Sequence, residues 1–217
     1  YEITTRLVGS EMCIRDRKDT VNKPRGSVLR LLRVSIVSTG LLACGLFFMG
    51  QFALFTYVRP FLETVTRVNA SGLSLILLAI GIAGLAGTLI VTTFLNARFY
   101  QTLMAIPLLM AIIAGMLLLV GHCTWAVTGL LSLWGMLATA APTGWWTWLA
   151  RTLPEDAEAG GGLMVAVIQL SIALGSTAGG LMFDRLGWQS SFGLSALLLV
   201  GALAVTFLTF RQIRQSH

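Results

Sequence analysis

Side chains that could do chemistry are sparse in this sequence, and most of the candidates are uncharged. Gln169 lies in the middle of a long apolar run, Gln51 and Tyr57 lie near the end of another, and Ser176 and Trp146 complete the set. Amides, hydroxyls and indoles can hydrogen-bond or stack against a small polar solute. They supply neither a nucleophile with its base nor a set of metal ligands. These residue types predict binding of a solute rather than catalysis.

Gln169 belongs to a stripe of small and polar residues. Spacings of three and four residues place the stripe on one helix face, and its members are Gly162, Ala166, Gln169, Ala173, Ser176 and Gly180. An amide near the middle of a membrane needs hydrogen-bond partners. A neighbouring helix or a polar cavity that binds substrate could provide them, and the sequence leaves both interpretations open.

Glycines at helical spacing predict close contact between helices. Without a Cβ atom, two backbones can approach each other at such positions. The residues assigned to this packing role are Gly81, Gly84, Gly175, Gly179 and Gly180.

Three tryptophans stand close together in the segment Pro142-Thr-Gly-Trp-Trp-Thr-Trp148. Their default interpretation is an aromatic belt at a membrane interface. Trp145 and Trp148 share a helix face that Trp146 does not, so at least one ring is expected to turn inward. An inward ring could stack on a planar ligand, and Trp146 is the cavity candidate.

The elements that must position these residues are long apolar helices. Of the 217 residues, 56% are hydrophobic and only 11% are charged, against about a quarter in soluble domains. A helix needs about 20 apolar residues to cross a bilayer. Six runs of this kind contain no Asp, Glu, Lys, Arg or His: Val34–Val58, Ser71–Leu95, Phe99–Val120, Thr124–Ala150, Gly160–Phe183 and Ser190–Phe210. The sequence predicts an all-α membrane protein with six transmembrane helices, antiparallel to their neighbours because the connectors are short.

The net charge of +6 is distributed as membrane-edge charge. Basic residues form no single patch, which excludes nucleic acid as a partner and leaves the lipid bilayer. One side of the predicted membrane carries Lys18, Lys23, Arg25, Arg30, Arg33, Arg98, Arg151, Arg211 and Arg214, and the other carries Arg59, Arg67 and Arg185. Short basic loops lie in the cytoplasm, so the bias predicts that both termini are cytoplasmic. Residues 18–33 form a basic linker and residues 211–217 a cytoplasmic tail.

No cofactor is expected. Cys13, Cys44 and Cys123 show no CxxC spacing, so neither a disulfide framework nor a metal site is indicated. Arg59 and Glu63, four residues apart in an outer connector, predict a loop ion pair, for which structural and functional roles both stay open.

The first residues differ in character from the rest of the chain. The stretch Leu7-Val-Gly-Ser-Glu-Met-Cys-Ile-Arg-Asp-Arg17 resembles a translated sequencing-adaptor read-through. Residues 1–17 are therefore expected to be a non-native tail, with the natural sequence beginning near Lys18, inside a gene.

Two segments resemble a known family. Gly50-Gln-Phe-Ala-Leu-Phe-Thr-Tyr-Val-Arg-Pro-Phe-Leu-Glu63 and Gly175-Ser-Thr-Ala-Gly-Gly-Leu-Met-Phe-Asp-Arg-Leu-Gly-Trp188 are similar to helices seven and eleven of major facilitator superfamily drug and sugar efflux transporters. The tryptophan segment and Val165-Ala-Val-Ile-Gln-Leu170 look closest to bacterial purine ribonucleoside efflux pumps. The connector Asn96-Ala-Arg98 departs from the superfamily's Asp- and Arg-rich loop motif, which puts its gating role in doubt.

The resemblance implies the C-terminal half of a twelve-helix fold in a bacterial inner membrane. It further implies proton-coupled efflux of small polar solutes by alternating access, with an N-terminal six-helix half as partner. Because the six runs hold no titratable carboxylate or histidine, the proton carrier is expected in that other half. A membrane scaffold or assembly subunit without transport is the alternative. An intramembrane enzyme is disfavoured because the runs lack a base and metal ligands.

The charge bias makes the orientation testable. Single cysteines at Asn69 and at Ser190 should react with a membrane-impermeant thiol reagent in intact cells, whereas one at Glu155 should not. Labelling at position 155 with protection at position 69 would invert the orientation.

Overall fold

The computed structural model describes residues 31–215, and every regular element in that range is a helix. The predicted tail, residues 1–17, and most of the predicted linker, residues 18–33, lie outside the described residues. So does the end of the predicted cytoplasmic tail. The all-α prediction is confirmed for the part of the chain that the structure describes.

The elements, in chain order, are α2 (Ser35–Phe55), α3 (Val58–Thr64), α4 (Ala70–Val120), α5 (Thr124–Thr152), α6 (Ala157–Leu186) and α7 (Trp188–Gln215). Within residues 31–215, five helical segments are long and apolar enough to cross a membrane, with α2 and α3 taken as one of them.

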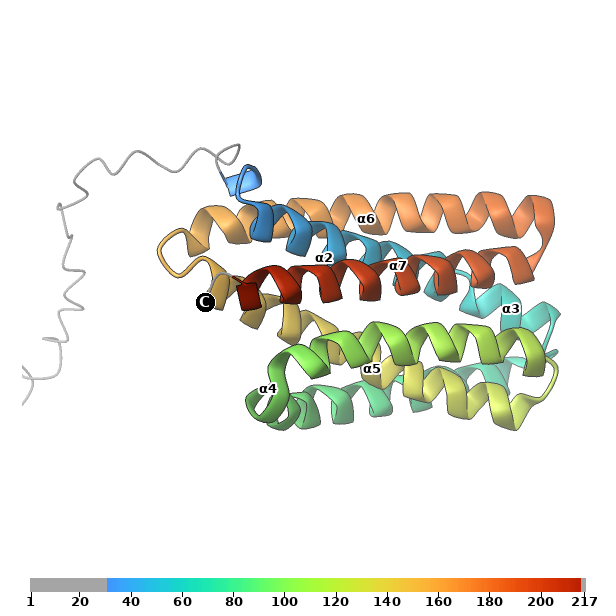
Figure 1. The fold of residues 1–217 in the computed structure, drawn as a ribbon. Coiled ribbons are helices and arrows are strands. Elements are labelled where there is room, and N and C mark those ends of the chain that lie inside the picture. Colours follow the sequence, from blue (N-terminus) through green and yellow to red (C-terminus); the bar gives the residue numbers. More distant parts are fainter. Residues whose placement is uncertain (1–30, 216–217) are drawn as a thin grey trace, which may run out of the picture.

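The helix α4 is two helices in one. Its 51 residues contain a single non-helical position, Arg98, with φ −148° and ψ 65°. A straight helix of that length would measure about 75 Å, far more than the roughly 30 Å hydrocarbon core of a bilayer. The break separates residues 70–97 from residues 99–120, and these two arms fold back on one another (Figure 1). They cover the second and third predicted runs.

The end of the first run differs from the sequence-based prediction. The sequence predicted a single helical run to Val58, whereas α2 stops at Phe55 and α3 begins at Val58. Tyr57, with φ −106° and ψ 11°, makes the break. Pro60 then lies in the first turn of α3, where a residue without an amide hydrogen is tolerated.

Local sequence explains two further boundaries. The Asn69 side chain accepts a hydrogen bond from the amide of Gly72 at 2.8 Å and so caps the start of α4. Gly187 ends α6 with φ +87°, a conformation that glycine adopts without steric cost. α7 can therefore start immediately at Trp188.

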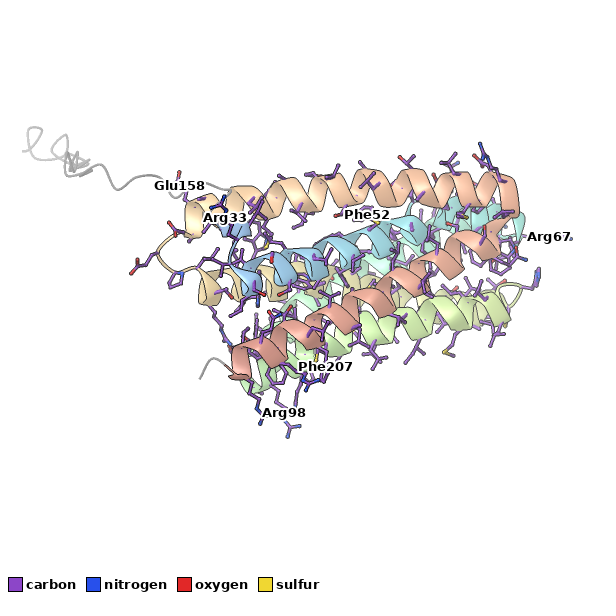
Figure 2. All side chains as sticks on the ribbon, turned by 45° about the horizontal axis from the view of Figure 1, so that its top comes forward. Arg33, Phe52, Arg67, Arg98, Glu158 and Phe207 are labelled. Carbon is purple, nitrogen blue, oxygen red and sulfur yellow. The ribbon has the colours of Figure 1, made fainter. Side chains whose placement is uncertain are left out.

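The helices form one bundle with two distinct ends. The Arg98 bend, the α5–α6 connector and the end of α7 lie at one end, and α3 with the α4–α5 and α6–α7 turns lies at the other (Figure 1). Figure 2 places Arg33 and Arg98 toward the first end and Arg67 at the second. Arg33 and Arg98 therefore lie at the end opposite Arg67, as the charge pattern predicted for these three residues. We call the end with the Arg98 bend the Arg98 end and the end with α3 the Tyr57 end.

α2 packs closely against two neighbouring helices. A Cβ atom added to Gly175 would collide with the backbone of Met49, and one added to Gly179 would collide with the backbone of Ala53. From the other side, the α7 hydroxyls of Ser191 and Ser195 donate to the carbonyl oxygens of Ala53 and Gly50 at 2.7 and 2.6 Å. α2 is held between α6 and α7 by backbone approach and by buried hydrogen bonds.

A second close contact joins α4 to α5. Gly87 faces the backbone of Met136, and the Thr139 hydroxyl donates to the Gly84 carbonyl oxygen at 2.7 Å. The packing role predicted for Gly84 therefore has a structural counterpart. Gly81 does not: a Cβ atom there would meet nothing within 4 Å. Gly81 points away from α5, and Gly87, which sequence reasoning did not select, makes the close approach.

These contacts predict opposite stability effects for two alanine substitutions. Alanine favours a helix over glycine by about 1 kcal/mol, and a clash in a well-packed interior costs about 1–3 kcal/mol. Gly175→Ala should lower the melting temperature of the purified protein in detergent. Gly115→Ala, at a helix position with open space around it, should preserve or raise it. Equal melting temperatures for both variants would show that α2 and α6 are not in backbone contact.

Candidate functional site

The candidate residues at the Tyr57 end come together between α2 and α6. The Thr56 and Ser176 hydroxyl oxygens are 3.0 Å apart, and the Tyr57 hydroxyl donates to the Ser176 carbonyl oxygen at 2.9 Å. Thr56 is exposed, and Tyr57 and Ser176 are half-buried. The interruption of the helix at Tyr57 allows the side chains of Thr56 and Tyr57 to reach α6. This Tyr57 cluster presents hydroxyl groups at the bundle surface.

The Tyr57 ring is fixed by its neighbours on α6. It stacks on Phe183 with a centroid distance of 5.3 Å and an interplanar angle of 26°. A Cβ atom added to Gly180 would collide with the Tyr57 hydroxyl, so the glycine makes room for the ring. The packing role predicted for Gly180 is thus directed at an aromatic side chain.

The helix α6 uses only one of its faces within the bundle. Its buried face includes Ser171, Gly175 and Gly179, all turned toward α2. Gln169 and Ala173, from the predicted stripe of small and polar residues, are exposed, as are the apolar side chains of Leu170 and Leu174. α6 therefore exposes the amide of Gln169 on an otherwise largely apolar outward surface.

The Gln169 side chain makes no hydrogen bond to any residue within 31–215. The first interpretation, a hydrogen bond to a neighbouring helix, therefore has no partner atom among these residues. An outward amide on a largely apolar helix is available to a solute or to a surface beyond the described bundle.

Gln51, one of the predicted cavity residues, lies inside the bundle. The side chain is buried, with 8% of its surface exposed, and its Oε1 atom has no hydrogen-bond partner among the described residues. On α2 the neighbouring positions 50 and 53 face α7 and α6. Because α2 is enclosed on these sides, a polar residue in the first run is directed into the protein.

The tryptophan segment divides into the two faces that its spacing predicted. Trp145 and Trp148 are buried, with ring centroids 6.1 Å apart, and Trp148 packs against Gly40. Trp146 is 44% exposed and lies beside Gly161 of α6. The inward rings are core residues, and Trp146 is the one that a planar ligand could reach.

The candidate set does not form one compact site. Along α6 the positions beside Trp146 and beside the Tyr57 cluster are about 15 residues apart, which corresponds to roughly 22 Å of helix. Gln169 lies between them and Gln51 lies inside the bundle. The arrangement is a strip of separated polar and aromatic groups, which suits a path or a wall better than a single pocket.

The predicted ion pair is present at the surface. Arg59 Nε donates to Glu63 Oε1 at 2.9 Å, with side chains 72% and 44% exposed. An exposed pair of this type contributes about 0–1 kcal/mol. It stabilises one turn of α3 and brings no charge into the strip.

Comparison with known proteins adds the class of protein. No family model matches the chain. The transcription regulatory protein OpdE of Pseudomonas aeruginosa is 60% identical over 185 residues, which cover 85% of this chain and 46% of that protein. The purine ribonucleoside efflux pump NepI of Escherichia coli K12 is 38% identical over 181 residues, 83% of this chain and 46% of the pump. The NepI protein of Shigella flexneri gives the same values.

The chain spans about half the length of the curated relatives it matches. Its long apolar helices are those of a membrane protein, and the similarity to NepI makes it a relative of an efflux transporter.

The buried amide of Gln51 gives a stability prediction. An unpaired buried acceptor costs about 1–3 kcal/mol, so Gln51→Leu, which nearly conserves volume, should raise the free energy of unfolding by about 1 kcal/mol. Gln51→Ala should lower it, because a void is left. Thermal unfolding of the purified chain measures both. A marked loss of stability in Gln51→Leu would mean that the amide does have a partner.

Proposed function

We propose that this chain is the C-terminal half of a secondary efflux transporter with a twelve-helix major facilitator fold. Each arm of α4 counts as one span, so that six helices form the half. The transported solutes belong to the small polar class that includes purine ribonucleosides. Support comes from the 38% identity to NepI and from the coverage of about half of that pump.

The outward faces of α6 support the second half as partner. A helix face with Gln169 and small residues makes few favourable contacts with lipid chains. Small residues do permit close contact with another helix. In transporters built from repeated halves, the substrate lies between them. The strip from Trp146 through Gln169 to the Tyr57 cluster would then be one wall of an alternating-access pathway.

The chemistry of the strip fits an uncharged, hydrogen-bonding solute. Hydroxyls and an amide both donate and accept, as do the edge of a purine and the hydroxyls of a ribose. The exposed indole of Trp146 offers a stacking surface for a planar base. No charged side chain in the strip would favour an ionic substrate.

Proton coupling is proposed to depend on the other half. The apolar runs hold no carboxylate or histidine. Glu63, which follows the first run, is exposed and paired with Arg59. A carrier must titrate while it faces the transport path, and Glu63 stands outside it. The proposed location is the bacterial inner membrane, with both termini cytoplasmic as the basic residues favour.

A second candidate function is a membrane scaffold or regulator that does not transport. The specific observation in its favour is the name of OpdE, a transcription regulatory protein, at 60% identity. Both candidates share the membrane fold, so a transport measurement on the full-length protein separates them.

Export by the full-length protein should depend on Gln169. In cells that carry the complete gene, Gln169→Leu should raise intracellular inosine by several-fold relative to wild type, because the amide that contacts the solute is lost. Expression and melting temperature should be unchanged, since the side chain makes no hydrogen bond within residues 31–215.

The matched control is Gln212→Leu, an amide on α7 that already bonds Ser35 and Thr39 at the Arg98 end. It should leave export intact. If wild-type full-length protein exports no nucleoside while its deletion alters transcription, the regulator is the correct function. If Gln169→Leu loses expression together with export, the residue serves helix packing.

A further inference from the structure

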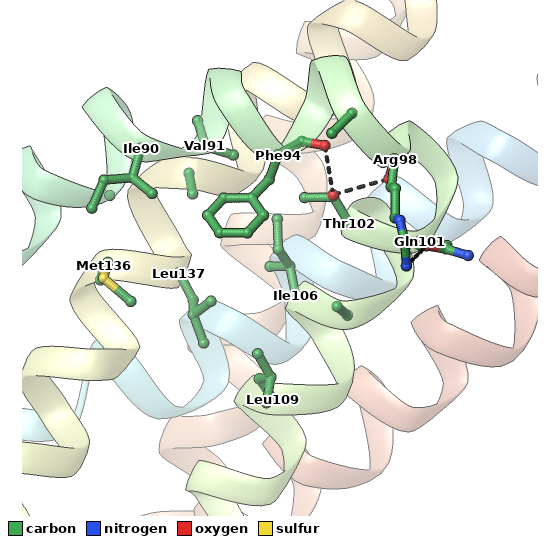
Figure 3. Close-up of a pocket in the computed structure, with 14 residues that line it drawn as sticks. Ile90, Val91, Phe94, Arg98, Gln101, Thr102, Ile106, Leu109, Met136 and Leu137 are labelled. Carbon is green, nitrogen blue, oxygen red and sulfur yellow. Dashed lines mark hydrogen bonds between the residues drawn. The ribbon is translucent and has the colours of Figure 1, made fainter.

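A groove on the bundle surface lies apart from the strip described above. It has a volume of about 610 Å³ and opens between the two arms of α4, with α5 behind them (Figure 3). Its walls are apolar, with Ile90, Phe94, Ile106, Leu109 and Met136 among them. Phe94 is 58% exposed and Ile90 47% exposed. Such side chains need an apolar occupant or a lipid environment.

One charged residue lines the groove. Arg98 forms the break in α4, and its exposed guanidinium Nη1 donates to Gln101 Oε1 at 3.4 Å. That acceptor is neutral and distant, and no carboxylate within residues 31–215 pairs with Arg98. The Thr102 hydroxyl, beside it, is already bonded to the Phe94 and Arg98 carbonyl oxygens at 3.1 and 3.0 Å. The positive charge is therefore available to an anion from outside.

We propose that this groove binds an anionic phospholipid, with one acyl chain between the arms of α4 and the headgroup phosphate on Arg98. The inference rests on the membrane location of the chain and not on export. Arg98 lies at the end of the bundle, where two arms that cross a membrane must turn, and hence at the depth of lipid headgroups. Apolar walls with a single cation at one end match the layout of a lipid. A partner helix would fill the apolar part but leave the guanidinium without an anion.

Arginine suits this role because its planar fork of donors matches a phosphate. Basic sites between membrane helices on the cytoplasmic side attract the headgroups of anionic lipids. The break at Arg98 exposes the guanidinium at the groove, and helix α4 thereby gains a polar terminus at the membrane interface.

Native mass spectrometry of the full 217-residue chain in mild detergent tests the proposal, with dioleoyl phosphatidylglycerol as the probe. The wild type should bind one phosphatidylglycerol more tightly than phosphatidylcholine. Arg98→Gln should weaken that binding by about tenfold, the equivalent of one lost hydrogen bond to a charged group. Arg98→Lys, which keeps the charge, should recover part of it. Ala105→Trp should block the groove and abolish the tight site.

Matched controls are Arg214→Gln and Ala204→Trp, exposed positions on α7 outside the groove. Both should bind phosphatidylglycerol as the wild type does. Binding by Arg98→Gln or Ala105→Trp at wild-type strength would overturn the proposal, as would an equal loss in the controls. A chain dimer that Ala105→Trp dissociates would assign the groove to a second copy instead. Since no transport is measured, failure here leaves the proposed export function unaffected.

Discussion

The close approach of α2 to both α6 and α7 is the contact on which the rest of the structure depends. In a membrane there is little hydrophobic force between helices, so packing and hydrogen bonds must hold them together. Gly175 and Gly179 let the α6 backbone touch that of α2, and Ser191 and Ser195 donate to α2 carbonyl oxygens from the opposite side. Because α2 is fixed along this length, Tyr57 at its end is delivered to Ser176 and Phe183.

This packing also decides which surfaces remain for function. Once the glycine face of α6 is used against α2, the face with Gln169 has nowhere to point except outward. Helix packing likewise directs Gln51 inward. It buries Trp145 and Trp148 and leaves Trp146 exposed. The proposed transport wall thus follows from a structural contact, and the polar groups themselves contribute little to holding the bundle together.

The two ends of the bundle differ in how their polar groups are paired. At the Tyr57 end, the Thr56 and Ser176 hydroxyls bond each other, the Tyr57 hydroxyl donates to the Ser176 carbonyl oxygen, and an exposed ion pair closes a turn of α3. At the Arg98 end, the chain reverses within α4 and leaves a guanidinium beside an apolar groove. In a membrane, the phosphate of a lipid headgroup can pair with that guanidinium, which is the basis of the lipid proposal.

The sequence by itself determined the helical class, the apolar runs, the separation of Arg33 and Arg98 from Arg67 and the Arg59–Glu63 pair, because hydropathy and local spacing act along the chain. It also identified Gly175 and Gly179, since their spacing already defines a helix face. Which face meets a neighbour is a property of three dimensions. Only the tertiary structure therefore showed that Gly87 rather than Gly81 contacts α5 and that Gln51 is buried. The break before α3 and the groove beside Arg98 likewise depend on contacts between residues distant in sequence, to which no local pattern responds.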